Sequence, residues 1–263
     1  MILSAYVQSA REVGEAKSFE GRLAAAWPRF VDCEARLSSL GPFLVREVGL
    51  ASGMQVLDAA AGIGCDALFV ASLGCQTTAN ELSCDFRKLI RARKSSELVT
   101  LTRHDWRDMV AAFGPTKFDA VLMLGNSLAL ILDDFTRDRI VAQAYEVCRK
   151  GGVFLVDQRN FERIYAEQAA IKEGRFEFGN KVMYCGDEVI AHPLSISRAS
   201  INMGYFEGRT SKVIGRLDMA TLLRGWLPNA LRRAGFVLEA HHDLGLSRHE
   251  EADFVTYVAR KPA

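Results

Sequence analysis

From about residue 53 to residue 160, short apolar runs alternate with amphipathic stretches. The apolar runs have the length of strands, and the stretches between them have helical spacing. This alternation predicts an α/β fold with a parallel, doubly wound sheet. The run at 118–124 is almost wholly apolar, as expected of a strand buried on both faces. Strands are expected at 53–58, 76–81, 98–103, 118–124 and 153–157, with helices at 67–73, 83–94 and 133–149.

The N-terminal flank is helical in pattern. Leu23, Ala26, Trp27 and Phe30 recur at spacings of one, three and four, as a packing stripe does, and Pro28 predicts the start of a helix. Past residue 160 the pattern becomes β-like and then ends in a helix and two strands. These later elements are expected at 181–184, 196–205, 211–217, 219–234, 237–243 and 254–260.

These patterns predict four parts along the chain. Residues 1–50 form a helical cap, and residues 51–160 form a ligand-binding core. Residues 161–217 form an antiparallel insertion that covers the active site, with a surface elaboration without function as the alternative. Residues 218–263 supply the last helix and strands of the core.

Composition narrows the function classes. The 263 residues include 33 Lys and Arg against 32 Asp and Glu, so the basic surplus typical of a nucleic-acid enzyme is missing. The basic cluster at 87–94 is interpreted as the solvated face of a helix. No apolar run reaches the ~18 residues of a membrane span, and no signal peptide precedes the cap. We therefore expect a cytoplasmic protein that binds neither nucleic acid nor membrane.

Cysteine and histidine spacing argue against a metal. Six cysteines without a C-x-x-C motif are interpreted as small buried residues in a reducing cytosol, and neither a disulfide framework nor a zinc site is expected. The adjacent His241 and His242 lie on a predicted strand, so their side chains face opposite sides and cannot chelate one ion. His104 is a possible base or a packing residue. No metal is predicted.

The segment from Val56 to Gly64 combines a strand, a turn of small residues and the start of a helix. Small residues let a ligand approach the backbone. Glu81, after the second strand, can accept both hydroxyls of a ribose. A dinucleotide site is disfavoured because the third glycine of its fingerprint is missing and Asp66 would repel a pyrophosphate. A nucleoside carrying a cationic sulfonium fits better.

Three motifs carry a family resemblance. The strand followed by D-x-x-x-G-x-G at 58–64 resembles motif I of the class I S-adenosylmethionine (SAM) dependent methyltransferases. The sequences Leu-Gly-Asn-Ser at 124–127 and Asp-Gln-Arg-Asn at 157–160 are similar to L-G-N-S and D-H-R-N of the glycine N-methyltransferase family. The resemblance runs from about residue 27 to residue 260 and is weak from 165 to 235. It implies a seven-stranded, mostly parallel, Rossmann-like sheet.

The resemblance also implies a SAM pocket. Arg36 would pair with the SAM carboxylate, unless it is a surface residue of the cap. Glu81 would hold the ribose, Asp105 would bond the adenine amino group, and Trp106 would form a ring wall or a plain core contact. The cofactor-binding positions implied are Trp27, Phe30, Arg36, Asp58, Ala60, Gly62, Gly64, Glu81, Asp105, Trp106 and Leu124.

For the methyl acceptor, the resemblance implies roles for five positions. The carbonyl of Gly125 and the amide of Asn126 would orient the attacking amine, with Tyr184 and Tyr205 nearby. Arg159 would pair with the acceptor carboxylate, or would be buried against Asp157 or another acid as a structural residue.

Two departures change the expected acceptor. Leu130 stands where the family has a histidine, and Met219 or Ala220 replaces a tyrosine. Both losses of polarity favour an acceptor larger or more apolar than glycine.

The sequence thus predicts a SAM-dependent methyltransferase acting on a small molecule, with S-adenosylhomocysteine as the second product. The amino group of an amino acid or another amine-bearing metabolite is the expected target. O- or C-methylation of a biosynthetic intermediate, and a catalytically silent SAM-binding protein, remain alternatives. A nicotinamide-dependent dehydrogenase is the weaker alternative. A homo-oligomer is expected because relatives associate through their N-terminal segments.

Overall fold

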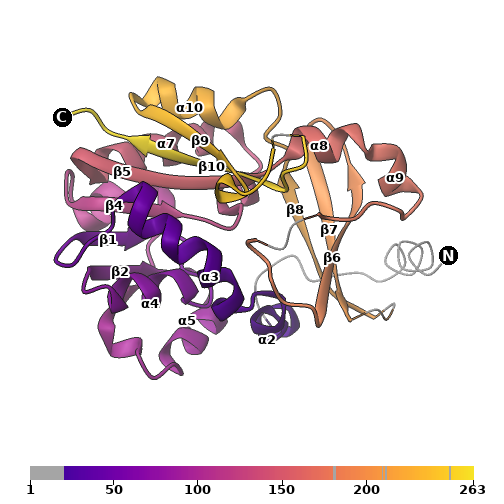
Figure 1. Cartoon of the computed structure of the whole chain (residues 1–263), viewed down its shortest axis with the longest axis horizontal. Coiled ribbons are helices and arrows are strands. Elements are labelled where there is room, and N and C mark those ends of the chain that lie inside the picture. Colours follow the sequence, from indigo (N-terminus) through magenta and orange to yellow (C-terminus); the bar gives the residue numbers. More distant parts are fainter. Residues whose placement is uncertain (1–20, 180–181, 209, 211, 249) are drawn as a thin grey trace.

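The computed structural model describes residues 21–263 except 180–181, 209, 211 and 249. Seven strands form the main sheet in the order β3-β2-β1-β4-β5-β10-β9 (Figure 1). β1 to β5 pair in parallel, whereas β10 runs antiparallel to both β5 and β9. The strands are β1 (Gln55–Asp58), β2 (Gln76–Asn80), β3 (Val99–Thr102), β4 (Phe118–Met123), β5 (Cys148–Arg159), β9 (Val237–His242) and β10 (Phe254–Arg260). The predicted seven-stranded, mostly parallel sheet is confirmed.

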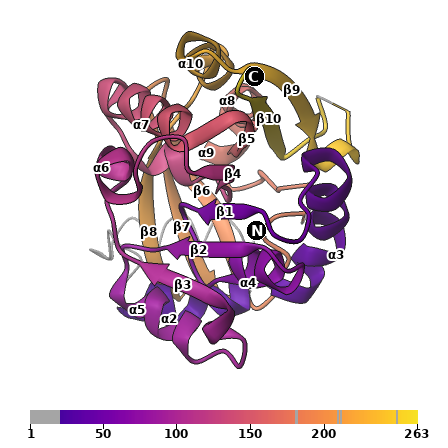
Figure 2. The same cartoon turned by 90° about the vertical axis from the view of Figure 1, so that its left-hand side faces the viewer.

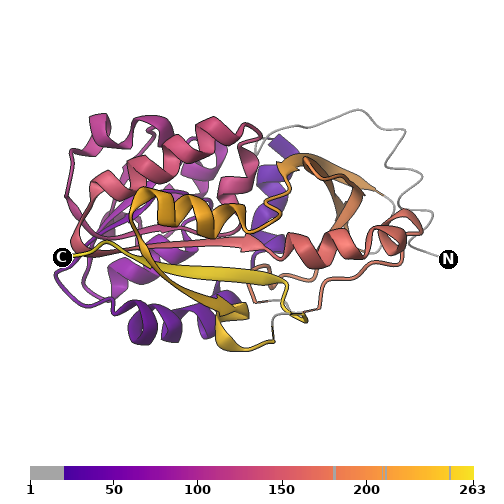
Figure 3. The ribbon, with the colours of Figure 1, turned by 90° about the horizontal axis from the view of Figure 1, so that it is seen from above.

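Helices cover both faces of this sheet (Figures 2 and 3). Successive residues of β4 pack into different clusters: Leu122 contacts the side of α3 and α4, and Val121 contacts the side of α6, α7 and α10. Because neither face meets solvent, the strand is apolar at nearly every position. The helices of the core are α3 (Cys33–Phe43), α4 (Cys65–Ser72), α5 (Cys84–Arg91), α6 (Met109–Phe113), α7 (Asp134–Val147) and α10 (Trp226–Ala234).

A second, smaller sheet lies beside the carboxyl ends of the parallel strands (Figure 1). Its strands β6 (Val189–Ile196), β7 (Ser200–Glu207) and β8 (Val213–Ala220) are antiparallel. Helices α2 (Gly21–Phe30), α8 (Phe161–Ala166) and α9 (Gln168–Lys172) lie nearby, and α2 and α9 contact β6. A shared apolar cluster joins this sheet to α2 and to the residues after β4. An antiparallel element is thus present where the sequence predicted one.

Several predicted boundaries are wrong. Pro28 lies inside α2, two residues before its end, and does not begin it. Residues 181–184 contain no strand among the described positions, and a turn at 197–199 divides the stretch predicted at 196–205. Residues 219–220 belong to β8, so α10 begins only at Trp226. β5 begins at Cys148, where helix was predicted.

The cysteine interpretation is also corrected. Cys33 and Cys65 form a disulfide with a Cα–Cα distance of 5.3 Å, joining the start of α3 to the start of α4. Cys75 and Cys148 are buried as expected, but Cys84 is exposed. A sequence separation of 32 does not distinguish this pair from the other possible cysteine pairs. Only the packing of the cap on α4 brings the two cysteines together. Disulfides are rare in a reducing cytosol, so the cytoplasmic location stays a prediction.

Candidate active site

The pocket opens at the carboxyl ends of β1, β2 and β4 and has a volume of about 450 Å³. This edge is where ligands bind in open parallel sheets, and the volume suits a cofactor together with a small molecule. Helix α2 and strand β8 close it from the other side. Among the predicted residues, those that line it are Trp27, Arg36, Ala60, Gly62, Glu81, Trp106, Leu124, Gly125, Asn126, Tyr184 and Tyr205. Those that do not line it are Phe30, Asp58, Gly64, Asp105 and Arg159.

The two glycines of the turn after β1 have different roles: one faces the pocket, and the other allows two helices to pack. Gly62 has φ +54°, and a Cβ there would meet only the Ala60 carbonyl oxygen at 4.0 Å, so its face is open to the pocket. Gly64 has φ +84°, and a Cβ there would lie 3.0 Å from the side chain of Ile90. Gly64 therefore permits helix α4 to pack against α5 and does not itself face the pocket.

Glu81 follows β2 and reaches across to this turn. Its carboxylate accepts hydrogen bonds from the backbone N–H of Gly62 (2.8 Å) and of Ser83 (2.7 Å). Burial raises the pKa of Glu81, and the backbone hydrogen bonds oppose that rise. Each carboxylate oxygen keeps a further lone pair for a ligand hydroxyl. Arg87, expected on a solvated face, is instead buried and donates to the Glu81 carbonyl (2.8 Å).

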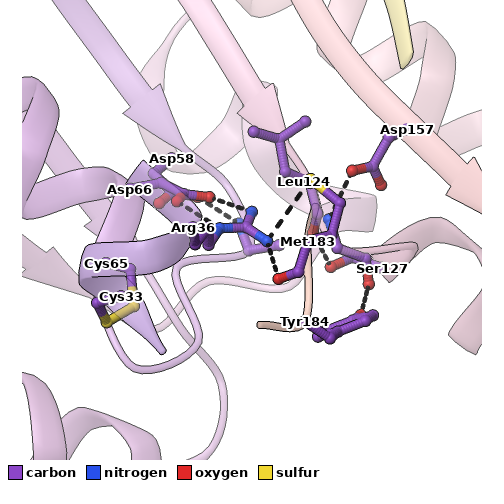
Figure 4. Close-up of polar contacts among 12 residues, drawn as sticks. Cys33, Arg36, Asp58, Cys65, Asp66, Leu124, Ser127, Asp157, Met183 and Tyr184 are labelled. Carbon is purple, nitrogen blue, oxygen red and sulfur yellow. Dashed lines mark hydrogen bonds and ion pairs between the residues drawn. A yellow bond between two sulfur atoms is a disulfide. The ribbon is translucent and has the colours of Figure 1, made fainter. Parts of the chain in front are cut away.

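Arg36 is held in a buried ion pair (Figure 4). Its Nε and Nη2 donate to the two carboxylate oxygens of Asp66 at 2.8 and 2.6 Å, and its Nη1 donates to the Met183 carbonyl at 2.8 Å. Burial lowers the pKa of Arg36, but the ion pair with Asp66 raises that pKa by more than burial lowers it, so the guanidinium stays charged. Asp66 was considered in the sequence only as an obstacle to pyrophosphate, and its role as the partner of Arg36 was missed.

Asp58 ends β1 beneath this pair and is buried. Its carboxylate accepts from the backbone N–H of Ala60 at 3.3 Å. Burial raises the pKa of Asp58 well above its ordinary value, and the nearby Asp66 raises it further. Asp58 therefore supports the turn from outside the pocket. The resemblance implied a direct contact with the cofactor, but Asp58 does not line the pocket.

The loop after β4 is clamped by Asp157. Gly125 (φ +76°) and Asn126 (φ +62°) are consecutive left-handed residues, and their backbone N–H groups donate to the two Asp157 oxygens at 3.0 and 2.6 Å. The Tyr184 hydroxyl donates to the Gly125 carbonyl. The Asn126 main-chain N–H is thus taken by Asp157 and is not available to an acceptor. The Gly125 carbonyl keeps one lone pair on the pocket wall.

The Asn126 side chain is hydrogen-bonded within the protein at both its oxygen and its nitrogen. Its side-chain oxygen accepts from the Arg159 backbone N–H at 3.0 Å, and its Nδ2 donates to Met219 Sδ at 3.3 Å. Met219, one of the two positions where the family's tyrosine was expected to be lost, therefore contacts the Asn126 side chain directly. Burial raises the pKa of Tyr184 to about 12, so its hydroxyl remains a hydrogen-bond donor at neutral pH.

Arg159 does not meet Asp157. Its guanidinium carbon lies 4.1 Å from the centroid of Phe178, 5.0 Å from that of Phe254 and 5.1 Å from that of Tyr184. Among the described residues, no carboxylate is within ion-pair distance of it. Stacking on aromatic faces stabilises the buried cation. The predicted contact with an acceptor carboxylate is not supported by this placement, because Arg159 lies outside the pocket lining.

Aromatic residues of the cap close the pocket. Trp27 and Tyr205 line it, with ring centroids 5.5 Å apart. Phe30 stacks on Tyr184 at 4.6 Å from behind. Opposite them, Trp106 donates its Nε1–H to the Ala59 carbonyl at 2.6 Å and presents its ring as a wall.

Asp105 is turned toward Arg107. Its carboxylate accepts from Arg107 Nε and Nη2, at 2.9 and 2.6 Å. That bidentate pair explains why Asp105 is absent from the pocket lining, where a contact with adenine was expected.

Sequence reasoning missed Asn80. This buried residue at the end of β2 donates to the carbonyls of Ala59 and His104 and accepts from the Thr102 hydroxyl, tying three strand ends together. No signal in the sequence distinguished it, because four of the five residues of this strand (QTTAN) are polar. Other lining residues that were missed are Val31, Ala59, Ala61, Ile63, Cys65, Asp66, Leu82, Ser83, Phe86, Ser127, Leu217 and Asp218.

The part of the chain that the structure describes offers neither a cluster of metal ligands nor a membrane-spanning helix. It contains no group of three His, Cys, Asp or Glu side chains placed to hold an ion. None of its helices combines the length and the apolar character needed to cross a bilayer.

Comparison with known proteins points to one class. A family model described as a methyltransferase domain matches residues 56–152. The glycine/sarcosine N-methyltransferase of Aphanothece halophytica is 26% identical over 239 residues, which cover 89% of this chain and 86% of that protein. The corresponding enzyme of Halorhodospira halochloris is 23% identical, covering 89% and 85%.

Solved structures agree on the fold. The CcbJ methyltransferase from Streptomyces caelestis superposes with a TM-score of 0.66 at 17% identity, over 94% of this chain and 99% of that one. The sugar N-methyltransferase KedS8 from Streptoalloteichus has a TM-score of 0.63 at 18% identity, over 95% and 98%.

The motif I turn, the pocket above it and these likenesses define a class I SAM-dependent methyltransferase. Within that class the chain resembles the glycine N-methyltransferase family, and its cofactor is SAM.

Proposed function

We propose that this enzyme methylates the amino group of a small molecule larger or more apolar than glycine. The observation that carries the proposal is Gly125, which lines the pocket in a loop held by Asp157 and Tyr184 and whose carbonyl keeps one lone pair beyond the Tyr184 bond. A carbonyl oxygen accepts a hydrogen bond from an N–H and so can turn the amine lone pair toward a methyl donor. Leu130 and Met219 line the same pocket and favour an apolar acceptor.

The residues present fit SAM. The open face of Gly62 admits the ligand to the main chain, and Glu81 has lone pairs for the ribose hydroxyls. Arg36 makes four hydrogen bonds, two to Asp66 and two to Met183, and keeps one of its five N–H groups for the amino-acid carboxylate. When bound, SAM supplies a methyl group already attached to a good leaving group.

The protein's own part is therefore alignment and exclusion of water. Tyr184, protonated at neutral pH, fixes the Gly125 carbonyl and does not act as a base. Trp27 and Tyr205 cover the pocket and keep water from the acceptor nitrogen. The acceptor must arrive as the free amine or lose its proton on binding, because an ammonium has no lone pair.

O- or C-methylation and a silent SAM-binding protein are the alternatives. The small-molecule partner, the cytoplasmic location and the homo-oligomer belong to the same proposal. The division into cap, core, insertion and C-terminal part is likewise proposed, with the small sheet of β6, β7 and β8 as the element that covers the acceptor.

The first test is isothermal calorimetry with SAM and S-adenosylhomocysteine, with NAD as the control ligand. Micromolar binding of the adenosyl pair, and none of NAD, is expected. An acceptor screen read by mass spectrometry then identifies the methylated atom. Methylation only at oxygen or carbon would contradict the N-methyltransferase proposal, and binding without any turnover would favour the silent protein.

A further inference from the structure

The charged side chains that line the pocket are mostly acidic. Four charged side chains line it among the described residues, and three of them are acids. The base, Arg36, is neutralised by a bidentate pair with Asp66. Glu81 and Asp218 remain without a cation in the lining, although Asp218 accepts from Asn202 Nδ2 at 2.6 Å.

Arg159 does not add a positive charge to the pocket lining. Its guanidinium is stacked on Phe178, Tyr184 and Phe254, and the residue lies outside the lining. The Tyr184 ring, by contrast, does line the pocket. An acceptor carboxylate in the pocket would therefore have no cation of its own to meet.

The β8 wall of the pocket is apolar on either side of Asp218. Leu217 and Met219 of β8 are buried and line the pocket together with Leu130. Met219 Sδ takes one of the two Asn126 side-chain N–H groups, and Asn126 is itself buried, so little of this amide is open to a carboxylate oxygen. Moving a carboxylate from water to such a surface without a partner is strongly unfavourable.

We propose that the acceptor is an amine that carries no carboxylate, so that amino acids are excluded as substrates. This rests on the proposed N-methyltransferase function and narrows it. The acidic lining attracts the protonated amine in solution, and the apolar wall of β8 takes its carbon skeleton.

The test compares three ligands that share one side chain: phenylalanine, phenylalaninamide and phenethylamine. The amide matches the acid in size and lacks only its charge. Calorimetry measures the binding of each to the complex with S-adenosylhomocysteine, and product formation with SAM gives kcat/KM. A second series of leucine, leucinamide and 3-methylbutylamine changes the side chain.

We expect the acid to bind at least about tenfold more weakly than its amide and its amine in the series that fits the pocket. An acid that binds as well as its amide overturns the inference, as does failure of every amide and amine to bind. Failure of S-adenosylhomocysteine to bind at all would instead reject the proposed function, so the two failures are distinguishable.

Variants at Met219 make the test sharper. Met219→Lys places a cation beside Asn126 and should reduce the discrimination between acid and amide by severalfold. Met219→Gln is the matched control, of similar length and uncharged, and should keep the discrimination. Equal ratios in both variants would show that charge at this wall does not govern the selection.

Discussion

The disulfide between Cys33 and Cys65 should contribute substantially to stability. It closes a loop with a sequence separation of 32 between the cap and the core. The loop-entropy relation gives roughly 4 kcal/mol for a loop of that length at 25 °C. For a chain of this size, such a loss corresponds to a fall in Tm of roughly 10 °C.

The perturbations are reduction with dithiothreitol and the variant Cys33→Ser. Unfolding is followed by calorimetry and by circular dichroism, with Cys84→Ser, an exposed free cysteine, as the matched control. Reduction should lower the Tm of the control as much as that of the parent, and should leave that of Cys33→Ser unchanged. Titration of thiols in unreduced, denatured protein should find four rather than six.

The disulfide should also affect the cofactor site. Cys65 lines the pocket, and its neighbour Asp66 holds Arg36 on the cap helix. Reduction should therefore weaken SAM binding by calorimetry. Six titratable thiols, or a Tm that is indifferent to reduction, would refute the reasoning.

Three further predictions concern single side chains. Glu81→Ala should weaken SAM binding roughly ten- to a hundredfold, since it removes a charged acceptor worth about 1.5–3 kcal/mol, and unchanged affinity by calorimetry would reject its role. Tyr184→Phe removes the hydrogen bond to the Gly125 carbonyl and should lower kcat about tenfold with SAM affinity nearly unchanged. Burial raises the pKa of Asp157 to about 6 from an ordinary value near 4, so its stabilising contribution is complete below pH ~4 and is lost as the pH rises through 6. Relative to Asp157→Asn, the parent should therefore lose about 2 kcal/mol of unfolding free energy between pH 4 and pH 7, measured by urea titration, and parallel curves would contradict the assignment.

The core strands were predictable because their burial leaves a direct mark on residue type. β4 is apolar at nearly all positions, and β10 was predicted with its exact bounds. The small sheet was harder because β6, β7 and β8 are half-buried and contain bulges, at Pro193–Ser195 and Tyr205–Phe206, that interrupt the alternation. Pro28 misled because a proline near the end of a helix is tolerated as well as one at its start.

The residues of the site also divide into those that the sequence could predict and those that it could not. Gly62, Glu81 and the loop at 124–127 could be predicted because they follow strands whose ends must meet at one sheet edge. The partners of the charged groups could not. Arg36 finds Asp66, Asp105 finds Arg107, and Arg159 finds aromatic rings, and each choice depends on side-chain geometry rather than on spacing.

By itself the sequence determined the class of fold and the edge of the sheet expected to bind the cofactor, because periodicity and small-residue turns are local properties of the chain. The methyltransferase chemistry followed from the resemblance of its motifs to a known family. Only the tertiary structure decided the Cys33–Cys65 link, the burial of Arg159 outside the pocket and the placement of Met219 on Asn126. Those features join residues that are 19 or more positions apart (Arg159 and Phe178 are the nearest pair), and burial free energy and charge pairing act between groups that meet only after folding.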